Sequence, residues 1–342
     1  MVAIETNPPL AQAYNKIRSR KPSVTCEHNH TNEREPEIHY EALPLVDLKG
    51  LTSNDDNERA QCVAQIVSAS SEWGFFQVVN HGISPKLLNQ MRREQMELFD
   101  TSFSRKSTCG LLNNSYRWGT ASATSPQDFS WSEAFHIPLT KISDKTCYGE
   151  FSSLREVMVE YARAMQNLAG LLAGVLITNL GQKIEDFEEN ICCDESTCFL
   201  RLNKYPICPV SPEIYGMVPH TDSDFLTIVH QDQVGGLQLM RGSKWVAVKP
   251  NKDALIVNIG DLFQAWSNNM YKSVEHRVMS NAKMKRFSVA YFLCPSYDSL
   301  IKSCCKNPSL YRDFTFGEYK LKVQEDAKLL GRKIGLPRFL RL

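Results

Sequence analysis

The 342-residue sequence lacks the features that mark membrane, secreted and nucleic-acid-binding proteins. No stretch approaches the ~20 consecutive apolar residues of a membrane-spanning helix, and the N-terminus lacks the apolar segment of a signal peptide. Lys and Arg number 39 against 38 Asp and Glu, so no excess of positive charge favours nucleic acid or a membrane surface. We expect a monomeric cytoplasmic protein that binds neither nucleic acid nor membrane.

Cysteine is present, but it forms no recognisable framework. The 11 cysteines include no Cys-x-x-Cys motif, and the adjacent pairs at 192–193 and 304–305 are poor disulfide partners for each other. This usage is typical of reduced thiols in a cytosolic protein. A Cys-His tract at 26–30 could hold a metal, but a solvated tail is the simpler interpretation.

The chain does contain clear helical patterns, without internal repeats. Apolar residues recur with helical spacing over 58–100, interrupted by a predicted strand, and again over 152–180 and 314–330. The polar N-terminal residues predict a flexible tail with one short helix. The expected divisions are this tail (1–40), a helical and strand part (41–195), a β-rich core (196–300) and a C-terminal helical extension (301–342).

Between residues 198 and 295 the pattern changes to short β-rich runs. Turn residues such as those at 235–236 separate seven or eight runs rich in β-branched and aromatic side chains. Many short strands with such punctuation are typical of a sandwich or jelly roll. The sequence therefore predicts a mostly β fold with surrounding helices.

The stretch GMVPHTDSDFLTIV places one histidine and two carboxylates at every second position. In a strand, His220, Asp222 and Asp224 would share one face, and the apolar run behind them indicates a core, where charged groups need partners or a metal. One more histidine would complete the two-histidine, one-carboxylate set that binds non-haem Fe(II). His276 is a better candidate than His230, which would lie ~30 Å further along the same strand.

A second pair of polar residues follows His276 by ten positions. Arg286 and Ser288 are two apart, so they share one face of a strand. A planar guanidinium beside a hydroxyl is a good clamp for a carboxylate. This half of the chain therefore offers an iron site and a carboxylate anchor.

The words HTD, HRV and RFS together resemble the plant iron(II)- and 2-oxoglutarate-dependent dioxygenases, over about residues 42–340. WGFFQVVNHGI resembles the N-terminal signature of that family. YRWGT, SWSEAFHIPL and NIGDLFQAWSN look most like gibberellin 2-beta-dioxygenases, especially the group acting on C20 gibberellins. The resemblance implies a double-stranded β-helix, or jelly roll, with Asp222 as the iron ligand and Asp224 beyond the ligand shell.

The resemblance also implies the cofactors and the reaction. Fe(II), 2-oxoglutarate and O2 would be needed, with ascorbate as a reductant. LNKYPICP resembles the segment whose Asn and Tyr line the 2-oxoglutarate site, here Asn203 and Tyr205, beside Arg286 and Ser288. The implied reaction hydroxylates a gibberellin at the 2-beta position and inactivates the hormone. Alternatives are another gibberellin step, flavonoid oxidation, or a non-catalytic hormone-binding protein, which the intact ligand set disfavours.

A gibberellin is a rigid apolar ring system with carboxylates, so its pocket should be mostly apolar with one or two fixed cationic or hydroxyl groups. Tyr116, Arg117 and Trp118 lie in a stretch that suits a loop. We expect Arg117 to pair with a carboxylate and Tyr116 or Trp118 to pack on the rings. The alternative is a structural salt bridge and a core tryptophan. Phe292 is a further candidate for the pocket, and His136 fits either the core or the substrate mouth.

Overall fold

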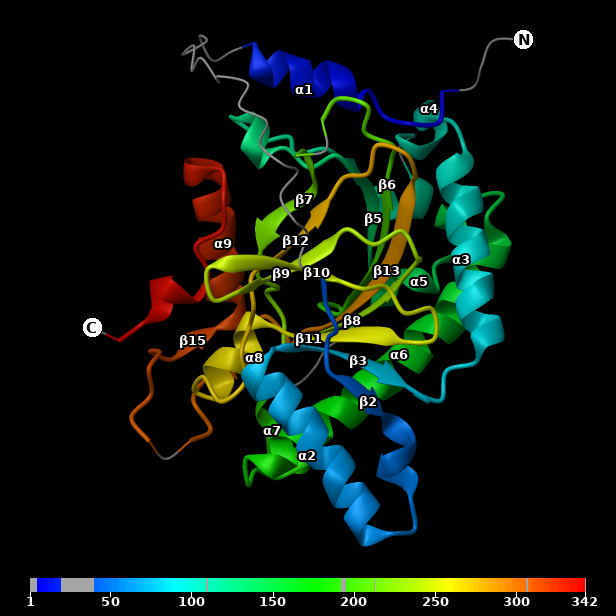
Figure 1. The fold of residues 1–342 in the computed structure, drawn as a ribbon. Coiled ribbons are helices and arrows are strands. Elements are labelled where there is room, and N and C mark those ends of the chain that lie inside the picture. The colour runs from blue at the N-terminus through cyan, green and yellow to red at the C-terminus, as the bar shows by residue number, and fades with distance from the viewer. Residues whose placement is uncertain are drawn as a thin grey trace.

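The computed structural model describes residues 5–19, 40–108, 110–191, 195–211, 213–305 and 307–341. Within these residues two large β-sheets form the body, one in front of the other in Figure 1. The smaller sheet contains, in spatial order, β1 (Tyr40–Glu41), β10 (Lys244–Val248), β9 (Leu237–Arg241), β12 (His276–Met279) and β7 (Tyr215–His220). The larger sheet contains β2 (Leu45–Asp47), β3 (Phe75–Val79), β11 (Leu255–Ile259), β8 (Leu226–Gln231), β13 (Arg286–Leu293), β6 (Phe199–Tyr205), β5 (Glu133–Pro138) and β4 (Tyr116–Trp118). This architecture confirms the predicted mostly β fold with a jelly-roll core.

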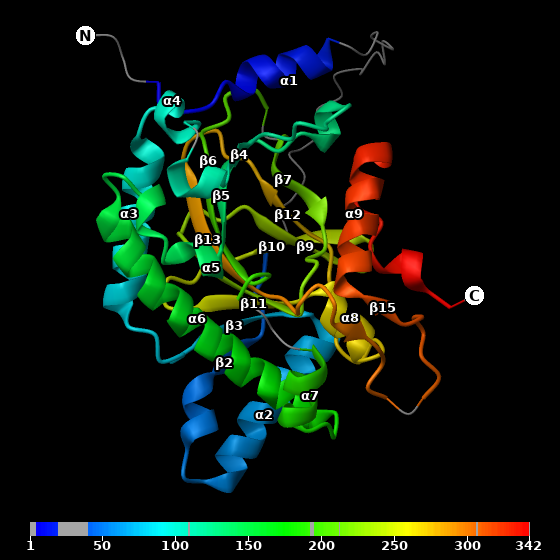
Figure 2. The ribbon, with the colours of Figure 1, turned by 180° about the vertical axis from the view of Figure 1, so that it is seen from behind.

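Helices cover the outer face of the larger sheet. These are α2 (Asp56–Glu72), α3 (Pro85–Asp100) and the long α6 (Ser152–Asn179). Figure 2, seen from behind, shows α6 crossing in front of the strands. Apolar residues three or four positions apart form the buried stripe of α6: Leu154, Met158, Tyr161, Met165, Leu168, Leu172 and Leu176. Each large apolar side chain removed from water stabilises the fold by ~1.5–3 kcal/mol, so this stripe fixes α6 against the sheet.

Alternation along β13 separates the core from the site. Phe287, Val289 and Tyr291 are buried in the same apolar cluster as the stripe of α6. Arg286 and Ser288 lie on the opposite face, between the sheets, because successive side chains of a strand alternate. The larger sheet therefore carries an apolar outer face and an inner face on which polar groups can gather.

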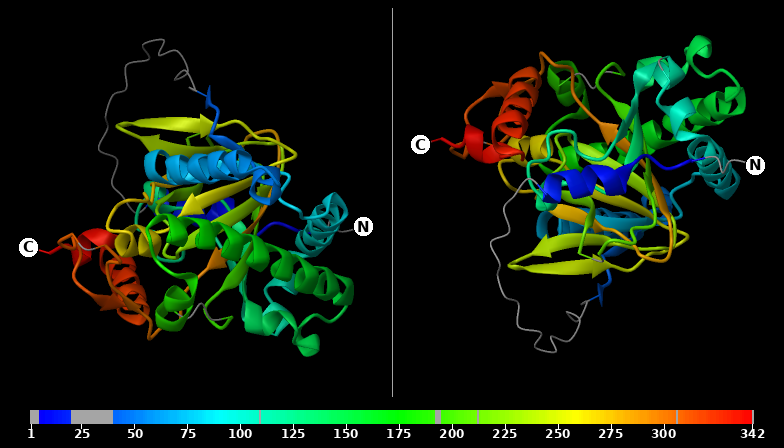
Figure 3. Two further views of the ribbon diagram at one scale, coloured as in Figure 1. Left: turned by 90° about the horizontal axis from the view of Figure 1, so that it is seen from below. Right: turned by 90° about the horizontal axis from the view of Figure 1, so that it is seen from above.

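The C-terminal part follows the last strand of the larger sheet. The small strands β14 (Leu300–Ile301) and β15 (Phe314–Thr315) lead into α9 (Phe316–Leu330). Figure 3 shows α9 and α3 on opposite sides of the sheets. The remaining helices are α4 (Phe103–Lys106), α5 (Leu139–Ile142), α7 (Ile184–Ile191) and α8 (Asp261–Trp266).

One short helix, α1 (Leu10–Arg18), lies in the N-terminal segment. Its Leu10 and Ile17 are buried against Phe129 and Trp131, so this part of the expected tail packs on the body. The Cys-His tract at 26–30 lies outside the described residues. Of the described helices, none has the length and apolarity needed to cross a membrane.

Candidate functional site

Three side chains converge where β7 ends and β12 begins. His220 is the last residue of β7, and its Cα pairs with that of His276, the first residue of β12. Asp222 follows in the loop after β7, and the ligand atoms of the three lie within 4.8 Å of one another. Its Oδ1 is 3.6 Å from Nε2 of His220 and 3.8 Å from Nε2 of His276. The structure thus brings together the three residues selected from the sequence.

Backbone carbonyls orient both imidazoles. Nδ1 of His220 lies 2.8 Å from the Val218 carbonyl oxygen, and Nδ1 of His276 lies 3.1 Å from that of Val274. A carbonyl only accepts, so each Nδ1 carries a proton, and Nε2 is the ring nitrogen that faces Asp222 and can bind a metal. Burial and the nearby His276 lower the pKa of His220 to about 3. At neutral pH His220 is therefore in the uncharged form that binds metals.

Asp222 has one oxygen committed and one available. Its Oδ2 accepts hydrogen bonds from Thr227 Oγ1 at 2.6 Å and Asn258 Nδ2 at 2.8 Å. Burial alone would raise the pKa of Asp222, but His276, His220 and these hydrogen bonds outweigh it and lower the pKa to about 2. Oδ1 is left facing the two imidazoles. Two imidazoles and one carboxylate are the donor set that suits non-haem Fe(II), so the residues present fit this metal.

Asp224 does not share the face of the other two, and the prediction from one continuous strand was wrong. β7 ends at His220 and the chain then bends, so the alternation stops. Asp224 is fully buried beneath Gly260, where a Cβ would lie 2.1 Å from its Oδ1. As expected, it lies outside the ligand group.

Asp224 still reaches the metal-binding group through a shared hydroxyl. Its Oδ2 lies 2.7 Å from Thr227 Oγ1, which also lies 2.6 Å from Asp222. Burial and the charge of Asp222 raise the pKa of Asp224 well above its ordinary value. Thr227 has a single proton to donate. A protonated Asp224 that donates to Thr227, which in turn donates to Asp222, accounts for both contacts of the hydroxyl, while Asp224 Oδ1 is left without a hydrogen-bond partner.

A buried guanidinium without an acidic partner lies on the larger sheet. Arg286 pairs in register with Tyr205 of β6, and Ser288 pairs with Asn203. Arg286 is 3% exposed and donates to Gln231 Oε1 at 2.6 Å and to Ser288 Oγ at 3.4 Å. Its Nε has no partner, and it pairs with no carboxylate among the described residues. A buried cation of this kind requires an anion, and the distal carboxylate of 2-oxoglutarate fits.

The metal-binding group and the guanidinium lie between the same two sheets. Asn258 of β11 holds Asp222, and the ring of Phe75 of β3 lies 5.1 Å from that of His276. Gly216 lets β7 approach the larger sheet, because a Cβ there would lie 2.7 Å from Cδ1 of Tyr205. Both groups therefore face one interior space.

Register also decides which of the predicted substrate residues face that space. Arg117 pairs with Ala134, His136 with Arg201, and Phe292 with Phe199. Paired residues of antiparallel strands point to the same face. These side chains therefore share the inner face of Arg286 and Ser288.

Tyr116 and Trp118 point to the opposite face, because neighbours in a strand alternate. The Tyr116 hydroxyl donates to Glu133 Oε2 at 2.5 Å inside the core, and Trp118 packs edge-on against Phe103 at 5.8 Å. The expectation that Tyr116 or Trp118 packs on the substrate beside Arg117 was therefore wrong. Residues 116–118 form strand β4 instead of a loop.

Aromatic rings and cations gather around His136. Its ring lies 4.0 Å from that of Phe199, which stacks on Phe292 at 4.2 Å. Burial, followed by the charges of Arg201, Lys320 and Arg117, lowers the pKa of His136 to about 4. His136 is therefore neutral at pH 7, and three cationic side chains are close enough to lower its pKa.

None of these three cations pairs with a carboxylate in the described part of the chain. Arg117 donates to the carbonyls of Asn114 and Tyr116, and Arg201 donates to Asn203 Oδ1. We name Arg117, Arg201 and Lys320 the cationic group. Sequence reasoning missed two of its members. Arg201 could have been found from its spacing of two from Asn203, whereas nothing in the sequence connects α9, and so Lys320, to this sheet.

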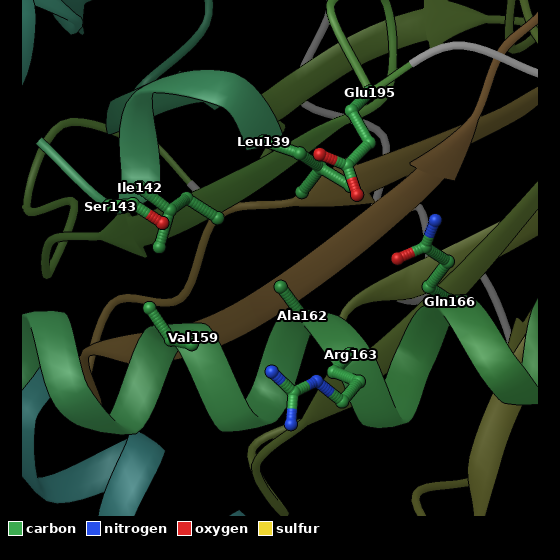
Figure 4. A pocket seen from close by; sticks show the side chains of 8 residues that line it. All are labelled: Leu139, Ile142, Ser143, Val159, Ala162, Arg163, Gln166 and Glu195. Carbon is green, nitrogen blue, oxygen red and sulfur yellow. The ribbon is translucent and has the colours of Figure 1, made fainter.

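A surface hollow lies elsewhere, between α5 and α6 (Figure 4). Its lining residues are Leu139, Ile142, Ser143, Val159, Ala162, Arg163, Gln166 and Glu195. It shares no residue with the site between the sheets.

Known proteins resemble this chain in sequence and fold. The 2OG-Fe(II) oxygenase superfamily model matches residues 196–295, and the model of the non-haem dioxygenase N-terminal region in morphine synthesis matches 43–154. Gibberellin 2-beta-dioxygenase 6 of Oryza sativa subsp. japonica is 56% identical over 87% of this chain and 85% of its own length. Gibberellin 2-beta-dioxygenase 8 of Arabidopsis thaliana is 50% identical over 98% of both. The crystal structure of JOX2 in complex with 2OG, Fe and JA is 30% identical, with a TM-score of 0.74 over 99% of this chain and 100% of that one.

Proposed function

The chain belongs to the 2OG-Fe(II) oxygenase superfamily, in the group of the gibberellin 2-beta-dioxygenases, and we propose that it hydroxylates gibberellins at the 2-beta position. One observation carries this proposal. Four gibberellin 2-beta-dioxygenases are 44–56% identical to this chain over at least 87% of its length, whereas two jasmonate-induced oxygenases reach 32–36%. The cofactor is Fe(II), and the cosubstrates are 2-oxoglutarate and O2.

His220, Asp222 and His276 would hold the iron. The two Nε2 lone pairs and the free Oδ1 of Asp222 support this assignment. When bound, iron and 2-oxoglutarate together activate O2, so that one oxygen atom enters the substrate C–H bond and 2-oxoglutarate leaves as succinate and CO2. The protein fixes positions and excludes water.

Arg286 would anchor the distal carboxylate of 2-oxoglutarate, with the Ser288 hydroxyl and Tyr205 beside it. The unpaired Nε of Arg286 supports this role. Asn203 lies between neighbours, since its Nδ2 is 3.5 Å from Ser288 Oγ and its Oδ1 accepts from Arg201 Nε at 2.9 Å. It therefore orients the hydroxyl on one side and a cation on the other.

The cationic group would bind substrate carboxylate. Arg117, Arg201 and Lys320 lower the pKa of His136, and none of the three pairs with a carboxylate among the described residues. The stacked rings of Phe199 and Phe292 offer an apolar surface beside them. A gibberellin combines these two properties, whereas a flavonoid has no carboxylate for the cations. This contrast favours the gibberellin over the flavonoid alternative.

We further propose a monomer that acts in the cytoplasm without nucleic acid or membrane partners. The cysteines of the described residues are free thiols, which fits a reducing compartment. Cell fractionation and light scattering test the two parts of this proposal.

The function is tested with a substrate panel. Purified protein with Fe(II), ascorbate, 2-oxoglutarate and air receives C20 gibberellins, C19 gibberellins or flavonoids, and product structure is determined by mass spectrometry and NMR. We expect a 2-beta-hydroxygibberellin and no flavonoid product. Oxidation at another gibberellin carbon, or of a flavonoid alone, would refute the proposal.

A further inference from the structure

A lysine from the C-terminal segment reaches the loop that carries Asp222. Lys333 lies between α9 and the 3-10 turn Leu336–Phe339, outside both regions matched by family models. Its Nζ lies 2.9 Å from the Thr221 carbonyl oxygen and 2.8 Å from Ser223 Oγ. Thr221 and Ser223 are the two neighbours of Asp222, so one ammonium group donates hydrogen bonds to the chain on both sides of the candidate ligand.

Asp261, the first residue of α8, binds both Lys333 and the same stretch of chain. Its Oδ2 lies 2.8 Å from Lys333 Nζ and accepts from Thr221 Oγ1 at 3.0 Å and from the Tyr319 hydroxyl. Its backbone N–H donates to the Asp222 carbonyl at 2.9 Å. Residues of α8, α9 and the C-terminal segment thus hold the main chain from 221 to 223.

The contact is well shielded from water. The side chains of Lys333 and Asp261 are 13% and 4% exposed, and the three protons of the ammonium have three acceptors. Gly335 allows the close approach, since a Cβ there would lie 3.1 Å from Asp261 Oδ2, and its φ of 75° suits glycine. The connection after α9 is therefore shaped to bring Lys333 to this loop.

The loop needs such support because it lies outside the sheet. β7 ends at His220, so strand pairing does not fix the main chain at Asp222. Thr227 and Asn258 hold the carboxylate, but they bond the side chain only. The contacts of Lys333 and Asp261 are made with the backbone and the adjacent side chains.

We propose that Lys333 is a positioning residue of the metal site, acting with Asp261 and Tyr319 to hold residues 221–223 so that Asp222 Oδ1 faces both imidazoles. The inference rests on the proposed function only in taking Asp222 as a metal ligand. It assigns the C-terminal segment a part in metal binding, although that segment contributes no ligand.

The test measures Mn²⁺ binding from the EPR signal of the free ion, without substrate. Partners that orient metal ligands typically contribute 10- to 100-fold in affinity, so Lys333→Met should weaken Mn²⁺ binding by about this factor. Lys333→Arg keeps the charge and should recover part of the loss. With iron as the metal, excess Fe(II) should restore part of the lost turnover.

Arg338→Met provides the matched control. Arg338 pairs with the buried Asp326 at 2.6 Å in the same C-terminal part, but none of its hydrogen bonds or ion pairs reaches residues 221–223. The Arg338→Met variant should have a lower melting temperature and an unchanged Mn²⁺ affinity. A loss of affinity that only follows lost stability would therefore appear in both variants, and that result would overturn the proposal.

Lys333→Met leaves the buried Asp261 without its cation, which can impair folding. The double variant Lys333→Met/Asp261→Asn removes that charge and should also bind Mn²⁺ more weakly than the wild type. A folded variant whose Mn²⁺ affinity is within twofold of the wild type would overturn the positioning role of Lys333. His276→Ala calibrates the assay. If His276→Ala loses Mn²⁺ and Lys333→Met binds it normally, only the positioning role of Lys333 is rejected. If His276→Ala also binds Mn²⁺ normally, the proposed metal site is rejected as well.

Discussion

At the scale of single residues, Asp222 and Asp224 lie two positions apart and share the hydroxyl of Thr227, yet their surroundings separate their roles. Asp222 has a pKa lowered to about 2 and a free Oδ1 facing two imidazoles. Asp224 is buried under Gly260 with a raised pKa. Environment, and not residue type, therefore makes Asp222 the candidate metal ligand and Asp224 a candidate for its support.

Asp222→Ala should abolish metal binding, because it removes a ligand. Asp224→Asn should keep Mn²⁺ affinity within a few-fold, since an amide can donate to Thr227 as the protonated acid does. Titration of both variants with Mn²⁺ checks this. Metal retained by Asp222→Ala and lost by Asp224→Asn would show that the acids are assigned in the wrong order.

Arg286→Ala should weaken 2-oxoglutarate binding strongly, because a buried charge pair is lost. The expected cost is ~2–5 kcal/mol, or roughly 30- to 4000-fold in the dissociation constant. Arg286→Lys keeps the charge without the planar fork and should be intermediate. Cosubstrate titration measures the effect, and an unchanged requirement for 2-oxoglutarate in Arg286→Ala would refute the role.

His136 predicts a pH dependence of stability. Its pKa falls from 6.5 to about 4 in the folded protein, so the unfolded state binds more protons between these values. The stability that neutral, buried His136 contributes to the free energy of unfolding is fully present above pH 6.5 and is lost as pH falls toward 4. The wild type should lose up to about 3 kcal/mol relative to His136→Asn over that range, measured by urea unfolding at several pH values.

His230 is the control for this prediction, because burial lowers its pKa to about 4 as well. The wild type should lose unfolding free energy relative to His230→Asn over the same pH range, and His230→Asn should leave the gibberellin KM unchanged. His136→Asn should change that KM, since His136 lies beside the cationic group. Parallel curves of unfolding free energy against pH for wild type and His136→Asn would show that His136 does not cause the pH dependence.

At the scale of elements, the period of two explains both the successes and the error of sequence reasoning. It selected Arg286 with Ser288, which share a face of β13. Applied to residues 116–118, the same rule separates Arg117 from its neighbours, but the small polar residues that follow favour a loop and conceal the strand. The alternation of His220, Asp222 and Asp224 predicts a longer strand than β7, which ends at His220. The run TDSD directly after His220 is a cluster of turn-favouring residues and marks that end in the sequence.

Strand β4 therefore predicts opposite phenotypes for adjacent residues. Arg117→Ala should raise the gibberellin KM roughly 10-fold, the lower range for a hydrogen bond to a charged group, with 2-oxoglutarate turnover without substrate intact. Tyr116→Phe should leave KM unchanged and cost ~1–3 kcal/mol of stability, since Glu133 loses a buried donor. A lowered melting temperature with normal kinetics in Arg117→Ala would remove it from the substrate site.

At the scale of the whole molecule, the sequence predicted the elements better than their meeting points. Helical and strand periods located α6 and the strands of the core, because burial of one face imposes them. Contacts between distant segments had no such signal: Asn258 on Asp222, Lys320 near His136 and Lys333 on Thr221 depend on how the sheets and α9 pack. These partners could be identified only in the folded structure.

If one site between the two sheets couples 2-oxoglutarate consumption to gibberellin 2-beta hydroxylation, succinate and the hydroxylated hormone must form together. The most direct measurement is the ratio of succinate to 2-beta-hydroxygibberellin formed by the same preparation, with Asp222→Ala as the blank. We expect one succinate for each hydroxylated gibberellin in the wild type and neither product in the variant. Succinate formation that does not respond to gibberellin, with no 2-beta-hydroxylated product, would contradict it.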